Sequence, residues 1–517
     1  MDGLKERFSH ISPRITVGLM LGLIVVCGAW LRLSDFDTLA RFNADQVRDA
    51  KVVDLMLEKS EFPLLGPKAG GTTFHLGPAF YYLEYASALV FGHNPAGMAF
   101  FIPLLSTASI VLFFFLFRIY FSPSLTLFLT LLYTVSFYAI RYTRFAWNPN
   151  AIPFFLLAFL LLLLTIPRSN TRKRIWWYVL LGIVMGIGMQ LHTTLLLMMP
   201  VIFFIAHALL FFRPSPLPFK SILGTISIVI LCHAPFIAHD IATSGENIVA
   251  FFQGTETKTE KTTSLIYTVF SNTEFFLQGS IYTLSGVEPQ KSWVRITKLF
   301  SSGNWLEISL FFGSLVLFFS GIILSIQRLR GDLSPRQRQF LLLILLYSSV
   351  LFLIFLPIAP ELNLRFFIAI IFLPFFFLGL IAEPLLKKLS FFPLAGPALL
   401  GIVILVLVTS NLLSYHTTYT LDGQERASIY GGISLGEATW LTEAIKQQTV
   451  THPQERLALQ PFEFRRSIIY LAEKKGLALE NIRPTEMTPD TLVFSITWNS
   501  QADTHRYSYA CCYDIVQ

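Results

Sequence analysis

The hydrophobic positions of this chain gather into long apolar runs that are separated by short polar segments. A helix needs roughly 17–25 apolar residues to cross the ~30 Å hydrocarbon layer of a membrane, and about eleven runs approach that length. The sequence therefore predicts a mainly α-helical polytopic membrane protein. The predicted spans are residues 15–33, 97–117, 124–140, 151–166, 176–191, 194–212, 221–238, 304–326, 340–357, 366–386 and 391–413.

The first apolar run has a basic start like that of a signal peptide, because Lys5, Arg7 and Arg14 precede it. A cleaved signal also needs a small-x-small site after the apolar run, and no clear site of this kind follows. We therefore interpret residues 15–33 as an uncleaved first span.

The pattern changes after residue 413. Helical periodicity recurs near 437–448 and 466–475, and strand-like runs occur at 456–461 and 492–498. This alternation predicts a small α/β domain over 414–517, following a transmembrane domain over 1–413.

Composition agrees with a membrane location, because 54% of the residues are hydrophobic and only 14% are charged. The net charge of +7 could suggest a nucleic-acid partner. The basic residues instead cluster in short loops between spans, which is the pattern of cytoplasmic loops. We therefore expect membrane lipid, and no nucleic acid, around the protein. The four basic loops contain Arg168 with Arg172, Lys173 and Arg174; Arg213 with Lys220; Arg328, Arg330, Arg336 and Arg338; and Lys387 with Lys388.

These loops also predict the orientation in the plasma (inner) membrane. Placing them and the N-terminus in the cytoplasm leaves 34–96, 239–303 and 414–517 outside. This model requires that residues 78–92 do not cross the membrane. They are apolar but short, and they carry Glu84 among three tyrosines, so we interpret them as an interfacial helix on the outer surface.

The four cysteines form no metal-binding pattern. Cys27 and Cys232 lie in apolar runs and are interpreted as packing residues. Cys511 and Cys512 are adjacent, so a disulfide between them would be strained. The sequence names no cofactor and no metal ligands, and leaves a requirement for a divalent cation open.

The first outer loop contains the most informative polar residues. From Asp45 onward it fits an amphipathic helix, with Asp45, Arg48 and Asp49 on one side. The apolar side carries Val47, Ala50, Val53 and Leu57. Such a helix can simply lie at the interface with solvated charges. A glycine-rich turn follows, GPKAGGTTFHLGPAFYYLEY, which contains Lys68 and His75 and leads into an aromatic helix at Pro78.

This order of motifs resembles the GT-C glycosyltransferases, in particular the protein O-mannosyltransferase and lipid A aminoarabinose transferase group. The resemblance continues through FYAIRYTRFAWNPNAIPF, GIGMQLHTT and LNLRFFIAIIFLPF, and through the polar tail that follows the last span. It covers most of residues 15–450, and the order of the motifs carries it more than any single motif.

The resemblance implies a function. Enzymes of this group transfer one sugar from a polyprenyl-phosphate carrier to an acceptor, which is a glycan, a lipid or a protein, on the non-cytoplasmic side of the membrane. Asp45 would be the general base that takes the proton of the acceptor, and in-line attack would invert the anomeric carbon. The departing phosphate needs fixed positive charge or hydrogen-bond donors. The candidate substrate-binding residues are Arg48, Asp49, Lys68, His75, Arg144, His192 and Arg365, with Arg365 preferred for the phosphate.

The sequence departs from the family pattern at two places. The family often has Asp-Glu where this chain has Asp45-Gln46, so a second acidic role would fall to Asp49. The family also often has a lysine just before the Pro-x-x-Tyr-Tyr element. Here His75 takes that neighbourhood, and Lys68 lies seven residues earlier.

Two other classes stay open. A secondary transporter would need ionisable residues near the membrane midplane, whereas the predicted spans carry Glu307 and Glu383 only near their ends. Another lipid-linked glycan ligase or polymerase would share the multi-span form. A transferase requires that Asp45 and the outer cations meet at one cavity, whereas a transporter requires a pathway across the membrane.

Overall fold

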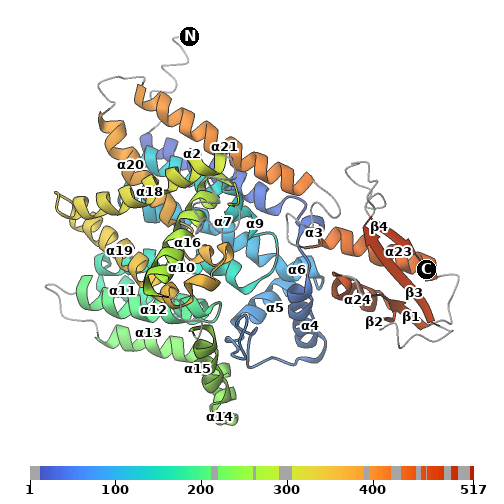
Figure 1. Ribbon diagram of the computed structural model, residues 1–517. Helices are drawn as coiled ribbons and strands as arrows, with labels where there is room; N and C mark the ends of the chain where they lie inside the picture. The colour runs from blue at the N-terminus through green and yellow to red at the C-terminus, as the bar shows by residue number, and fades with distance from the viewer. Residues whose placement is uncertain are drawn as a thin grey trace.

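A bundle of apolar helices and a small mixed sheet make up the computed structural model (Figure 1). The structure describes residues 12–210, 219–259, 264–289, 305–388, 395–420, 432–449, 456–460, 463–481, 491–498 and 513–516. Lys5, Arg7, Arg213, Cys511 and Cys512 lie outside these described residues.

Helices occupy the described part of every segment that was predicted to span the membrane. Several begin at a proline that follows a capping side chain, because the missing N–H of proline costs nothing in the first helical turn; examples are Pro123 after Ser122 and Pro335 after Ser334. The helices are α2 (Pro13–Leu33), α6 (Pro95–Ala99), α7 (Phe101–Phe117), α8 (Pro123–Val135), α9 (Phe137–Arg141), α10 (Ile152–Thr165), α11 (Thr171–Gly188), α12 (Thr193–Ile205), α13 (Phe219–Cys232), α14 (Ala234–Ala242), α18 (Trp305–Leu329), α19 (Pro335–Phe355), α20 (Leu373–Lys388) and α21 (Ala395–Thr420).

The predicted polytopic, mainly helical fold class is confirmed, although fewer helices than predicted are long enough to span alone. Within the described residues, six helical segments have the length and hydropathy of a full span, against about eleven predicted. The predicted span 221–238 is broken between α13 and α14, which meet at a bend of 61°. Pro235, in the first turn of α14, cannot donate a backbone hydrogen bond, which accounts for the break.

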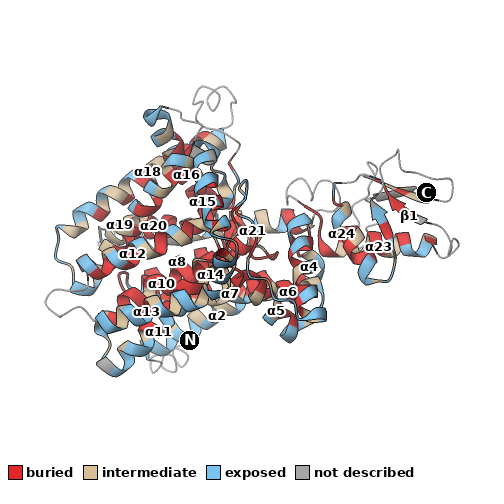
Figure 2. Ribbon diagram, turned by 90° about the horizontal axis from the view of Figure 1, so that it is seen from below, coloured by how far each residue is buried: buried red, intermediate tan, exposed pale blue. Residues whose placement is uncertain are grey.

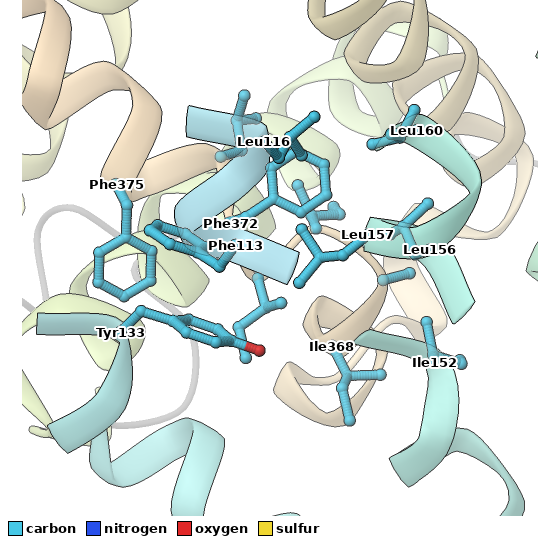
Figure 3. Close-up of a cluster of buried hydrophobic side chains, with 14 of the residues drawn as sticks. Phe113, Leu116, Tyr133, Ile152, Leu156, Leu157, Leu160, Ile368, Phe372 and Phe375 are labelled. Atoms are coloured by element: carbon cyan, nitrogen blue, oxygen red, sulfur yellow. The ribbon is translucent and has the colours of Figure 1, made fainter. Parts of the chain in front are cut away.

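Aromatic rings fill the centre of the bundle (Figure 3). The ring of Phe113 stacks on Tyr133 with centroids 4.6 Å apart, and Phe375 meets Phe113 edge-on at 5.6 Å. The buried guanidinium of Arg32 in α2 is tied to this core, since its Nε donates to Ser106 Oγ at 2.9 Å and its Nη1 to the carbonyl of Thr134 at 2.9 Å. The predicted packing role of Cys27 is wrong, because this residue is exposed on α2. Cys232 is half-buried.

The described part of the segment 239–303, which was predicted as an outer loop, contains the end of α14 and the helices α15 (Glu246–Thr259) and α16 (Leu265–Ser285). The second half of α16 is buried against α18, α20 and α21. Its polar positions, such as Asn272 and Glu274, lower its hydropathy and hide it from a search for apolar runs. Inside the bundle, Nδ2 of Asn272 donates a hydrogen bond to the carbonyl of Phe352 at 2.9 Å.

The first loop contains three helices, α3 (Phe36–Leu39), α4 (Ala44–Lys59) and α5 (Ala79–Phe91). α5 coincides with the predicted interfacial helix and has 13 residues, too few to cross a bilayer. A capping box begins α4, since the side chain of Asn43 accepts from the third helical residue and Gln46 Oε1 accepts from the Asn43 backbone N–H at 3.0 Å. Gln46 also donates to the carbonyl of Ala146 at 2.7 Å. The glutamine after Asp45 therefore starts and anchors the helix.

The tail forms the small α/β unit that the sequence predicts. It contains α23 (Leu435–Thr449), β1 (Arg456–Leu459), α24 (Arg465–Lys474), β2 (Leu479–Asn481), β3 (Thr491–Trp498) and β4 (Tyr513–Val516). The sheet order is β2-β1-β3-β4, with β1 parallel to both of its neighbours and β4 antiparallel to β3. The predicted strands at 456–461 and 492–498 correspond to β1 and β3.

The tail packs directly on the first loop, beside α3, α4 and α6 (Figures 1 and 2). The backbone N–H of Phe42 donates to the carbonyl of Ile433 at 2.9 Å, and that of Leu435 donates to Ala40 at 2.7 Å. The apolar side of α4 is buried in one hydrophobic cluster with α23 and α24. This side therefore faces the tail domain, which leaves the opposite, polar side of α4 for other contacts.

Candidate active site

A cavity of about 290 Å³ lies between the first loop and the helical bundle. It brings together five of the eight predicted site residues: Asp45, Arg48, Lys68, His192 and Arg365. These residues come from α4, the loop before α5, the start of α12 and the segment before α20. The remaining lining residues are Ala69, Gly70, Gly71, Thr72, Leu76, Trp147, Asn148, Pro149, Thr193 and Phe366.

Arg48 joins the two aspartates of α4. Its Nη1 lies 3.0 Å from Asp45 Oδ1, and its Nε donates to Asp49 Oδ1 at 2.8 Å. The side chain of Asp45 is 57% exposed, whereas that of Asp49 is fully buried. Asp45 thus faces the cavity as an accessible carboxylate, and Asp49 holds Arg48 from behind.

Burial controls the protonation of the carboxyl groups behind the cavity. Desolvation raises the pKa of Asp49 to about 6, although the hydrogen bond from Arg48 opposes this shift. Glu84 of α5, which the sequence analysis did not select as a site residue, is also buried. Burial, and then the charge of Asp49, hold the pKa of Glu84 well above its usual range.

A short hairpin forms the glycine-rich wall of the cavity. Lys68 pairs with His75 across the hairpin, and the Ala69 N–H donates to the carbonyl of Phe74 at 2.9 Å. Gly71 turns the chain with a φ of 75°, a conformation that glycine adopts without strain. Lys68 is exposed at the cavity, whereas His75 is not among its lining residues. The Nδ1–H of His75 donates to the carbonyl of Gly66 at 2.8 Å, which closes the base of the hairpin.

His192 stands just before α12 and caps it. Its Nδ1 accepts a hydrogen bond from the backbone N–H of Thr194 at 3.1 Å. In the neutral ring the proton is therefore on Nε2, so His192 can offer an N–H donor to a ligand.

Arg365 lies in the 3-10 helix η5 (Leu364–Ala369), between two aromatic rings. Its guanidinium carbon is 5.7 Å from the ring centroid of Trp147 and 5.3 Å from that of Phe366. Trp147 and Asn148 precede α10, within the motif FYAIRYTRFAWNPNAIPF. The motif was recognised in the sequence analysis, but these two lining residues were not selected from it.

Arg144 lies away from the cavity, although it was selected from the same motif. It is fully buried, and its Nη1 donates to the carbonyl of Leu31 at 3.1 Å. Its guanidinium also lies 4.7 Å from the ring centroid of Tyr419. Arg144 therefore ties the end of α2 to α21, and the structure does not bring it to the other candidates.

The charges that line the cavity suit an anionic ligand. Arg48, Lys68 and Arg365 line the cavity together with one carboxylate, Asp45, which already accepts from Arg48. A divalent cation needs several oxygen or nitrogen ligands with little competing positive charge. No group of three or more His, Cys, Asp and Glu side chains among the described residues has a suitable arrangement. These residues do not fit a bound metal.

Comparisons with known proteins agree with this arrangement. Residues 75–239 match the family model described as dolichyl-phosphate-mannose-protein mannosyltransferase. The fold is similar to that of ArnT from Cupriavidus metallidurans, solved with undecaprenyl phosphate bound, with a TM-score of 0.56, 10% identity and 94% of each chain covered. It is also similar to the apo oligosaccharyltransferase of Archaeoglobus fulgidus, with a TM-score of 0.50 and 12% identity over 91% of this chain and 65% of that one. None of the curated protein sequences matches the chain.

These matches confirm the resemblance to the GT-C glycosyltransferases and the membrane-embedded fold that it implies. The family match, together with the fold, indicates a membrane glycosyltransferase.

Proposed function

We propose that this membrane glycosyltransferase transfers a single sugar from a polyprenyl-phosphate donor to an acceptor on the non-cytoplasmic side of the membrane. The observation that carries the proposal is the cavity that one accessible carboxylate, Asp45, lines together with three cations. The description of the matching family, which names a dolichyl-phosphate sugar, supports the choice of donor. So does the undecaprenyl phosphate that is bound to ArnT.

Asp45 acts as the general base. An acceptor hydroxyl is a weak nucleophile until its proton is removed, and an exposed carboxylate at the cavity can take that proton as the hydroxyl attacks. The new bond forms between the acceptor oxygen and the anomeric carbon, while the bond from that carbon to the phosphate oxygen breaks. Attack opposite the leaving phosphate inverts the anomeric carbon. Arg48 orients Asp45 through their 3.0 Å contact, and Asp49 fixes Arg48 in turn.

The cations stabilise the departing phosphate. Arg365 can bind two phosphate oxygens at once through its planar guanidinium, and Lys68 adds a point charge from the hairpin. His192 adds an Nε2–H donor. These groups are in place before the reaction, so they stabilise the growing negative charge without reorganising.

The acceptor, whether a glycan, a lipid or a protein, approaches from the side that faces away from the cytoplasm. The distribution of Lys and Arg supports an orientation with the N-terminus inside and the tail domain outside. Single cysteines in a cysteine-free protein would test this in intact cells. We expect Gln447→Cys, on the exposed surface of α23, to react with an impermeant reagent and Asp332→Cys, between α18 and α19, to be protected. The reverse pattern would contradict the orientation.

The function is tested by supplying the purified protein with polyprenyl-phosphate sugars of defined composition. We expect release of polyprenyl phosphate, and an acceptor whose mass increases by one sugar. If no such donor is cleaved in the presence of glycan, lipid and protein acceptors, the proposal is wrong. Transfer of a preassembled oligosaccharide in one step would instead assign the protein to the ligases.

A further inference from the structure

One aromatic ring in the cavity has no part in the chemistry described above. Trp147 lies in extended backbone with φ −159° and ψ 134°, immediately before the 3-10 helix η1 (Asn148–Ala151). Its side chain is half-buried and lines the same cavity as Asp45 and Arg365.

The indole of Trp147 packs against the buried ring of Phe145. The ring of Phe145 stacks on Trp147 with centroids 6.2 Å apart and an angle of 23° between the planes. Phe145 is 1% exposed, and the guanidinium of Arg41 lies 3.5 Å from its ring centroid. The backbone N–H of Arg41 in turn donates to the carbonyl of Arg144 at 3.0 Å. Trp147 is therefore the outermost layer of a fixed stack, and it loses little side-chain freedom when a ligand packs on it.

The groups around the indole indicate which part of the donor can bind there: the phosphate, the polyprenyl chain or the sugar ring. A phosphate needs the cations and gains nothing from an indole surface. A polyprenyl chain needs a wholly apolar surface, whereas this cavity contains Asp45, Arg48 and Lys68. A sugar ring has both requirements, because its C–H face packs on the negative face of an aromatic ring while its hydroxyls need polar partners at the edge.

Asn148 supplies such a polar partner beside the indole. It lines the cavity and is 6% exposed, and its Nδ2 donates to the carbonyl of Leu191 at 2.6 Å. One N–H of Nδ2 is used in this way, and Asn148 can offer a ligand its Oδ1, an acceptor suited to a hydroxyl. His192, with Nε2–H as a donor, lines the same cavity.

We propose that Trp147 and Asn148 form the subsite for the sugar ring of the donor, with the indole as the stacking surface and Asn148 Oδ1 as an acceptor for a sugar hydroxyl. This inference rests on the proposed function, and it adds the place in the cavity where the sugar is distinguished from its carrier. The guanidinium carbon of Arg365 lies over the indole ring, 5.7 Å from its centroid, so the anomeric phosphate and the sugar ring would occupy adjacent parts of one cavity.

The test compares two ligands that differ only by the sugar: a polyprenyl phosphate and the same lipid esterified with one sugar that the wild-type protein transfers. We expect Trp147→Ala to weaken binding of the sugar ester by about tenfold and to leave binding of the bare phosphate unchanged. The affinity of Trp147→Phe for the sugar ester should lie between those of Trp147→Ala and the wild type, because phenylalanine keeps a smaller aromatic surface. Asn148→Ala should likewise weaken binding of the sugar ester and leave binding of the bare phosphate unchanged.

The control is Trp176→Ala, because Trp176 is 70% exposed on α11 and lies outside the cavity. If Trp147→Ala or Trp147→Phe weakens both ligands equally, the indole only positions Arg365, and the subsite is wrong. Unchanged binding of both ligands also overturns it. A wild-type protein that binds neither ligand, and that transfers no sugar from any polyprenyl-phosphate sugar, would contradict the proposed function itself, which separates that failure from a failure of the subsite alone.

Discussion

The hydroxyl of Tyr470 donates a hydrogen bond to Asp54 Oδ2 at 2.9 Å, which connects the tail domain to the helix that carries Asp45. Lys474 adds ion pairs to Asp54 and Glu58, each at 2.8 Å. Asp54 follows Asp45 by nine residues, which is about 14 Å along α4 and half a turn around it. The tail thus holds α4 on the side opposite Asp45.

This connection predicts a stability effect. Tyr470→Phe removes one hydrogen bond while the ring stays packed on Phe42, so we expect the protein to lose about 1 kcal/mol of stability. Binding of the donor should be unchanged, because Tyr470 lies outside the cavity. Thermal unfolding in detergent, with Tyr267→Phe on an exposed part of α16 as a control, would measure the loss. Equal unfolding temperatures for Tyr470→Phe and the wild type would contradict it.

The role of Asp45 predicts a loss of turnover without a loss of binding. Asp45→Asn keeps the size of the side chain but cannot take a proton, so the rate at saturating donor should fall by ~10²-fold or more. Asp37→Asn, an exposed carboxylate on α3, is the matched control. Normal turnover in the Asp45→Asn protein would remove Asp45 from the reaction and make Asp49 the next candidate.

The role of Arg365 predicts a loss of donor affinity. Arg365→Ala removes a charged contact to phosphate, which corresponds to ~2 kcal/mol or more. Arg365→Lys should recover only part of the affinity, because an ammonium cannot make the two-pronged contact of a guanidinium. Equilibrium binding of polyprenyl phosphate tests this, with Arg172→Ala, an exposed residue in the first turn of α11, as the control. An Arg365→Ala protein with wild-type affinity would show that the phosphate binds elsewhere.

The buried carboxyl of Asp49 predicts a pH dependence of stability. Its pKa is raised from 3.8 to about 6, so between these values the folded chain binds a proton that the unfolded chain has released. This contribution to stability is complete below about pH 4 and is lost as the pH rises through 6. The unfolding temperature of the wild type relative to Asp49→Asn should therefore be higher at pH 5 than at pH 7. The opposite trend would mean that the ion pair with Arg48 outweighs burial.

Much of the fold follows from the length of the apolar runs. Any helix that crosses a membrane must satisfy its backbone hydrogen bonds internally over the same thickness of hydrocarbon. α16 was missed because its polar residues lower its hydropathy. Hydropathy does not show that such residues form hydrogen bonds inside the bundle. The docking of the tail was missed for a related reason. The apolar side of α4, with Val47 and Val53, has the same pattern whether it faces lipid or another part of the protein.

The sequence identified some residues of the cavity, misplaced one and missed others. Asp45, Lys68 and Arg365 were found because charged residues near the ends of apolar runs are conspicuous, and the order of the motifs gave them roles. Arg144 has the same local signature, but its guanidinium points into the protein, and side-chain direction is not encoded in spacing. Trp147 was not selected because an aromatic residue in a chain with fifty phenylalanines carries no distinguishing signal.

The contact between the first loop and the tail also constrains biosynthesis. Asn43 Oδ1 accepts from the backbone N–H of Ile433, which the ribosome adds 390 residues later. At 5–20 residues per second, α4 waits roughly 20–80 s for the surface that covers its apolar side. During that interval it is an exposed amphipathic helix, open to chaperones and proteases. We expect a chain whose synthesis stops before the tail to be degraded, so that only finished molecules accumulate.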